Sequence, residues 1–116
     1  MLREPVSGIV TVSAGGHGGK TGRYEKRLSD LAGLYEDTAA YEEALAQLGD
    51  PLVYAVEDFR PNDQPGDLIY GVTRMVPGRI GDEFFLTRGH IHAKADRPEF
   101  YYGQQGKGLM QLESPE

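Results

Sequence analysis

The chain has 116 residues, 39% of them hydrophobic and 26% charged, which suits one soluble domain with a single core. Its net charge of −6 argues against nucleic acid as a partner, because nucleic-acid binding needs a basic face. No cysteine is present, so histidine and carboxylate side chains remain as metal ligands. With neither a signal-peptide pattern nor a membrane-spanning stretch, we expect a cytoplasmic protein without a membrane partner.

The N-terminal segment predicts one strand followed by a loop. Residues 8–12, GIVTV, are mostly β-branched and predict a short strand. Residues 14–22, AGGHGGKTG, predict a flexible glycine-rich loop. This loop contains Gly-Lys-Thr, but Ala14 stands where a phosphate-binding loop has its first glycine, so we exclude that motif.

A helix is expected after a turn-rich stretch at 28–36. Asp37 fits the N-cap of a helix over 38–48, and Gly49 is a typical stop signal. The apolar side chains of this helix repeat at helical spacing and form one stripe: Tyr41, Ala44, Leu45 and Leu48. We expect this stripe to pack on a sheet and to have no role in chemistry.

From Pro51 onward the apolar pattern changes to the alternation that is typical of strands. The predicted strands are 52–58, 68–76, 83–87, 90–92, 99–104 and 109–112, with a loop at 59–67 and turns at 77–82 and 105–108. Closely spaced antiparallel strands of this kind predict a mainly β fold, either a sandwich or a barrel.

The stretch 87–102, TRGHIHAKADRPEFYY, contains two of the three histidines, one residue apart. In an extended chain His90 and His92 point to the same face, with Cα atoms about 6.5–7 Å apart, and can share one metal ion. Glu99 follows a loop, and a hairpin return would bring its carboxylate opposite the histidines. Two histidines and one carboxylate commonly bind a divalent transition metal. The pattern alone also fits two surface histidines beside an ordinary carboxylate, and both interpretations stay open at this point.

The segment 77–116 resembles the first metal-binding motif of the cupins, and more narrowly the cupin-type glucose-6-phosphate isomerases. The pattern is T-x-G-H-x-H-x6-E-x-Y followed by a G-x-G turn, and the matching residues are Thr87, Gly89, His90, His92, Glu99, Tyr101, Gly106 and Gly108. The six-residue gap between the second histidine and the glutamate favours the isomerases over other cupins. Upstream segments LSDLAGLYEDTAAYEEAL, PLVYAVE and GDLIYGVTRMVPG also resemble their counterparts.

The resemblance implies a mainly β cupin jelly-roll barrel with a short N-terminal helical segment. The whole chain, 1–116, would be one cupin domain, with a strand, loop and helix in 1–50 and the barrel portion in 51–116. The family has a fourth ligand, a histidine in a later segment, and the chain ends at Glu116 before such a segment. We therefore expect a form that is truncated after the first motif, with an incomplete barrel that lacks its C-terminal strands. The remaining histidine, His17, has no counterpart as a ligand.

The resemblance also implies the site residues. The metal ligands would be His90, His92 and Glu99, and the substrate contacts would be Tyr54, Thr73, Thr87, Gly89 and Tyr101. Hydroxyl groups and a glycine N–H can hold phosphate and sugar oxygens without adding charge. Without the resemblance, the tyrosines could equally be packing residues, the threonines ordinary strand formers, and Gly89 a bulge.

The implied activity is metal-dependent aldose–ketose isomerisation of glucose 6-phosphate and fructose 6-phosphate, a step of glycolysis and gluconeogenesis. Glu99 is the nearest candidate base, and Tyr101 could donate to the developing oxyanion. The expected cofactor is Fe(II), with Mn, Ni or Zn as alternatives, and the expected partners are a sugar phosphate and a second copy of the chain. There are two alternatives: a metal-binding cupin without catalysis, and a different cupin enzyme such as an oxygenase or epimerase.

Overall fold

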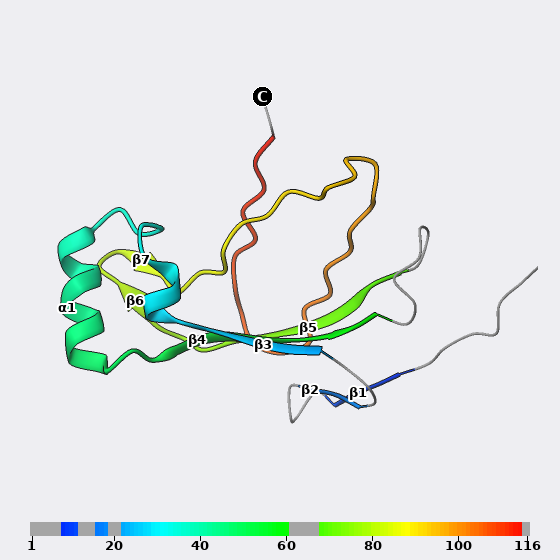
Figure 1. Ribbon diagram of the computed structural model, residues 1–116, viewed down its shortest axis with the longest axis horizontal. Coiled ribbons are helices and arrows are strands. Elements are labelled where there is room, and N and C mark those ends of the chain that lie inside the picture. Colours follow the sequence, from blue (N-terminus) through cyan, green and yellow to red (C-terminus); the bar gives the residue numbers. More distant parts are fainter. Residues whose placement is uncertain (1–7, 12–15, 19–21, 61–67, 115–116) are drawn as a thin grey trace, which may run out of the picture.

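The computed structural model describes residues 8–11, 16–18, 22–60 and 68–114. The elements are β1 (Ile9–Thr11), β2 (Gly16–Gly18), β3 (Gly22–Arg27), a 3-10 helix η1 (Leu28–Leu31), α1 (Thr38–Leu48), β4 (Leu52–Phe59), β5 (Tyr70–Met75), β6 (Arg79–Ile80) and β7 (Glu83–Phe84). The strands form three antiparallel sheets, in the orders β1-β2, β3-β4-β5 and β6-β7 (Figure 1). The expected mainly β class is confirmed, because the elements are antiparallel strands with one short α-helix and one 3-10 helix. Within the described ranges the sheets do not close into a barrel, which is consistent with part of a cupin fold.

The helix α1 begins and ends where the sequence predicts. The Asp37 side chain accepts a hydrogen bond of 2.9 Å from the Ala40 N–H, which satisfies one of the free donors of the first turn. Gly49 ends the helix in the left-handed conformation, with φ of 65°. No helix in the described part of the chain is long and apolar enough to cross a membrane.

The sheet β3-β4-β5 has two distinct faces because directly opposed residues of antiparallel strands share a face. Val56 of β4 lies between Tyr24 of β3 and Thr73 of β5. Tyr54 is two residues before Val56 on β4, so its side chain is on the same face. We call the face that carries Tyr54 and Thr73 the Tyr54 face. The opposite face carries an ion pair of 2.7 Å between Arg23 and Glu57.

The apolar core lies at one end of this sheet, where η1, α1 and the β6-β7 hairpin gather (Figure 1). Its buried residues are Leu28, Leu31, Tyr35, Tyr41, Val53, Tyr54, Ile80 and Phe85. The Tyr41 hydroxyl donates a hydrogen bond of 2.9 Å to the Leu28 carbonyl, which ties α1 to η1. The core therefore anchors the N-terminal end of β4, which carries Tyr54.

The N-terminal segment differs from the prediction in two respects. The glycine-rich stretch is not simply a loop, because residues 16–18 form β2, where His17 lies opposite Val10. Strand β3 was not predicted, because GRYEKR lacks an apolar alternation, yet it pairs with β4 along most of its length. The parts of the predicted strand and loops at residues 12, 14–15, 19–21 and 61–67 lie outside the described residues.

The C-terminal strand predictions were wrong for this chain. The strand predicted at 83–87 is confined to β7, and no strand is found at 90–92, 99–104 or 109–112. A strand needs a hydrogen-bonded partner, and within the described residues these stretches have none. The segment extends away from the sheet and returns (Figure 1), and it exposes several large apolar side chains: Ile91, Phe100, Tyr102, Leu109 and Leu112.

Candidate metal centre

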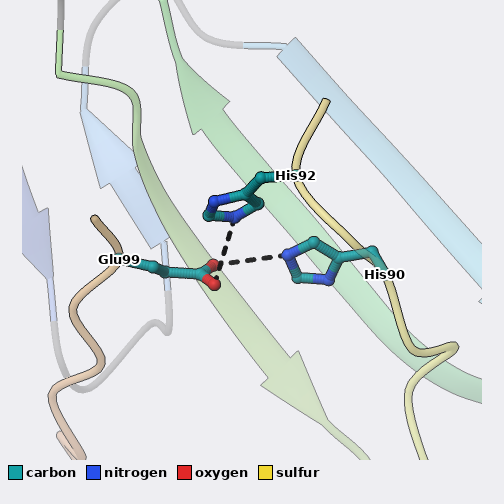
Figure 2. Close-up of side chains that lie close together, drawn as sticks. All are labelled: His90, His92 and Glu99. Carbon is teal, nitrogen blue, oxygen red and sulfur yellow. Dashed lines mark ion pairs between the residues drawn. The ribbon is translucent and has the colours of Figure 1, made fainter. Parts of the chain in front are cut away.

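Figure 2 shows that His90, His92 and Glu99 point toward one another. Nε2 of His90 lies 3.5 Å from one carboxylate oxygen of Glu99, and Nε2 of His92 lies 3.2 Å from the other. The two imidazole rings are stacked, with centroids 5.3 Å apart. The loop 93–98 reverses the chain between them, so the triad comes together as the sequence pattern predicts, although neither side of the turn is a strand.

A backbone contact fixes the orientation of the His92 ring. Its Nδ1 lies 3.1 Å from the carbonyl oxygen of Arg97. A carbonyl can only accept, so a hydrogen bond here places a proton on Nδ1, and Nε2 is then the nitrogen that would bind a metal. Histidines that bind metals usually donate their other N–H in this way. The sequence could not reveal this partner, because it is a main-chain atom.

The three side chains together could hold a single divalent ion. Each offers one ligand atom, and these atoms all lie within 4.8 Å of one another. Ligand atoms about 2.0–2.2 Å from one ion lie about 2.8–3.6 Å apart at tetrahedral or octahedral angles. Both histidine-to-glutamate distances, 3.5 Å to one carboxylate oxygen and 3.2 Å to the other, fall in this range. The side chain of His92 is 27% exposed and that of His90 is 54% exposed, so the cluster is open on one side for further ligands such as water or substrate.

Tyr101 is coupled to the same carboxylate. Partial burial and a hydrogen bond with the Glu99 side chain raise the pKa of Tyr101 to about 12, and the nearby Tyr24 phenol also contributes. The hydroxyl is therefore protonated at neutral pH, and it can donate to Glu99 or to an oxygen that approaches the site. Of the contacts implied by the resemblance, Tyr101 is the one most directly linked to the triad.

The raised pKa of Tyr101 predicts a measurable titration. In metal-free protein, ultraviolet titration of the seven tyrosines should include one that ionises near pH 12, and Tyr101→Phe should remove that phase. The folded-state pKa of Tyr101 lies above the ordinary value of 10.0. The stability that the protonated Tyr101 contributes to the fold is therefore fully present below pH 10 and is lost as the pH rises toward 12. A Tyr101→Phe protein that keeps the late phase would contradict this assignment, and Tyr102→Phe, a neighbour that is 76% exposed, is the control.

Tyr54 is held close to the segment that leads into the triad. Its hydroxyl accepts a hydrogen bond of 3.5 Å from the Arg88 backbone N–H. The Arg88 guanidinium donates to the Asp30 carbonyl at 3.0 Å, which anchors this stretch to η1. Thr87 and Gly89 flank Arg88 and are exposed, and the space where a Gly89 side chain would project contains no atom within 4 Å. These two residues are therefore accessible to a ligand.

The last implied contact, Thr73, lies on β5 and is exposed on the Tyr54 face. In the described structure, Tyr101 is therefore coupled to the triad, and Tyr54 contacts the segment that precedes it in the chain. Thr73 lies on the sheet. One residue that the sequence analysis missed is Tyr24, which interacts electrostatically with both Tyr54 and Tyr101. Only the register of the unpredicted strand β3 reveals its position.

Comparison with known proteins identifies the family. The sequence profile described as "Glucose-6-phosphate isomerase (GPI)" matches residues 25–116. The chain is 56% identical over 115 residues to a protein of Sinorhizobium medicae named glucose-6-phosphate isomerase, covering 99% of this chain and 54% of the relative. It is 50% identical over 91 residues to the glucose-6-phosphate isomerase of Thermococcus kodakarensis (78% of this chain, 47% of the relative) and 45% identical over 91 residues to that of Pyrococcus furiosus (78% and 48%).

The chain spans about half the length of these curated relatives. With the profile match covering most of its residues, the chain belongs to the glucose-6-phosphate isomerase family.

Proposed function

We propose that this chain takes part in the metal-dependent interconversion of glucose 6-phosphate and fructose 6-phosphate, and that it binds both the metal and the sugar phosphate. The observation that carries the proposal is the convergence of His90, His92 and Glu99 in a member of the isomerase family. We place the reaction in glycolysis and gluconeogenesis, and the protein in the cytoplasm.

The reaction moves hydrogen between C1 and C2 of the sugar phosphate. A divalent ion at the triad would act as a Lewis acid that polarises the oxygens on these carbons. Tyr101 keeps its proton at neutral pH and donates to the oxygen on which negative charge develops. Glu99 is the nearest carboxylate to accept a proton, although a carboxylate that also holds a cation is a weaker base.

The substrate contacts are proposed from the groups that surround the triad. Thr87 and Gly89 are exposed directly before His90 and offer a hydroxyl and a backbone N–H to the phosphate. Tyr54 and Thr73 offer hydroxyls on the Tyr54 face of the sheet. All four are neutral, so they select a phosphate and sugar oxygens by hydrogen-bond geometry and not by net charge.

We propose Fe(II) as the native metal, because two histidines and one carboxylate are a common donor set for this ion; the same set also accepts Mn, Ni and Zn. We also propose that the chain forms one cupin domain and that the protein is a homodimer. The exposed apolar side chains of the segment 88–114 support burial of this surface in a larger assembly.

The proposal is tested by a coupled assay that converts fructose 6-phosphate to glucose 6-phosphate. The chain is loaded with Fe(II) or Mn(II), and the assay is repeated after treatment with EDTA. We expect turnover that disappears with EDTA and returns when the metal is restored. Stoichiometric metal without turnover would contradict catalysis by this chain and would support the alternative of a metal-binding cupin without activity.

A further inference from the structure

We propose that Tyr24 is a further substrate-positioning residue, which presents its hydroxyl from β3 to a sugar hydroxyl of the bound substrate. This inference rests on the proposed function, and it adds a residue outside the motif that carries the family resemblance. It starts from the register of the sheet.

The register places Tyr24 on the Tyr54 face. Tyr24 lies opposite Val56, and Val56 lies opposite Thr73, so the three side chains form a row across β3, β4 and β5 on one face. Tyr54 is two residues from Val56 and shares that face. Among the described strand residues of this face, only Tyr24, Tyr54 and Thr73 carry hydroxyl groups. Two of these three, Tyr54 and Thr73, are among the substrate contacts that the resemblance implies.

The neighbours of Tyr24 connect it to the metal centre. Its phenol interacts electrostatically with those of Tyr54 and Tyr101, and Tyr101 is two residues from Glu99 and coupled to its carboxylate. The Tyr24 side chain is 48% exposed, so its phenol is accessible and not part of the core. Partial burial raises its pKa above the ordinary value, and its hydroxyl is therefore a neutral donor and acceptor at physiological pH.

The neutral phenol of Tyr24 is suited to a sugar hydroxyl. The Asp58 carboxylate lies one alternate position along the same face and interacts electrostatically with Tyr24. Arg60 forms an ion pair of 2.5 Å with Asp58, so this cation is already engaged. Lys26 lies one alternate position from Tyr24 in the other direction along β3, on the same face, so the charges around the phenol are mixed. The phenol itself is neutral, and it matches a sugar hydroxyl, which carries no charge and can both donate to and accept from it.

The test compares Tyr24→Phe with Tyr70→Phe in the Mn(II)-loaded chain. Tyr70 lies on the opposite face of the same sheet, so its substitution removes the same hydroxyl group away from the site. For Tyr24→Phe we expect the KM for fructose 6-phosphate to rise about 3- to 10-fold, the range that one neutral hydrogen bond supplies. We expect kcat within about 2-fold, an unchanged metal stoichiometry, and an unchanged Kd for inorganic phosphate. Tyr70→Phe should leave all four quantities as in the parent chain.

The outcomes separate this inference from the proposed function. If the parent chain turns over the substrate and Tyr24→Phe has the same KM, the role of Tyr24 is overturned and the proposed function stands. If the parent chain binds fructose 6-phosphate in calorimetry without turnover, the Kd replaces the KM, and the same 3- to 10-fold weakening in Tyr24→Phe supports the inference. If the metal-loaded parent chain neither binds nor converts the sugar phosphate, both are overturned.

Discussion

Replacing His92 with alanine is expected to weaken binding of a divalent metal by more than about 100-fold, because loss of even an outer-shell partner of a ligand typically costs 10- to 100-fold. His92 is the less exposed histidine of the pair, and the Arg97 carbonyl fixes its ring with Nε2 directed at Glu99. Its loss leaves one histidine and one carboxylate, too few protein ligands to hold the ion firmly. Equilibrium dialysis against Mn(II), followed by metal analysis, measures the change.

The matched control is His17→Ala, which removes the histidine for which the family resemblance implies no ligand role. We expect its metal affinity to equal that of the parent chain. If His17→Ala loses the metal and His92→Ala retains it, the assignment of the ligands is wrong.

Replacing Leu31 with alanine is expected to lower the free energy of unfolding by about 2–5 kcal/mol, the usual range for removal of a buried leucine side chain. Leu31 is fully buried in the cluster that joins η1, α1, β4 and β6. The cost combines lost burial of apolar surface with the cavity that remains, because close-packed neighbours relax only in part. Urea denaturation followed by circular dichroism measures the effect.

Leu109→Ala provides the control for this stability prediction. Leu109 is 88% exposed in the C-terminal segment, and we expect a change within about 0.5 kcal/mol. Equal losses in the two variants would contradict the placement of the core, since they would mean that Leu109 is as well packed in solution as Leu31.

The helix could be predicted because its signals are local. The Asp37 cap, the spacing of the apolar residues and the Gly49 stop all act within a few residues, and α1 has the expected bounds. The triad could also be predicted from spacing, because His90, His92 and Glu99 lie within one turn-linked segment and a short reversal suffices to bring them together.

The strands were harder to predict because their stability depends on partners that are distant in sequence. Most residues of β3 are charged, and the ion pair between Arg23 and Glu57 becomes apparent only when β4 is placed beside it. Conversely, the stretch 99–104 has the composition of a strand but no paired neighbour within the described residues. Tyr24 was missed for the same reason, because its relation to Tyr54 and Tyr101 follows from tertiary pairing alone.

The most direct test of the account is the metal content of the chain and of two ligand variants. Metal-stripped protein is dialysed against a slight excess of Fe(II) without oxygen, and the ion bound per chain is then measured by mass spectrometry. We expect one ion per chain in the parent protein, and a loss of most of it in both His92→Ala and Glu99→Gln. A parent chain without bound metal, or variants that retain the full content, would contradict a metal centre at His90, His92 and Glu99.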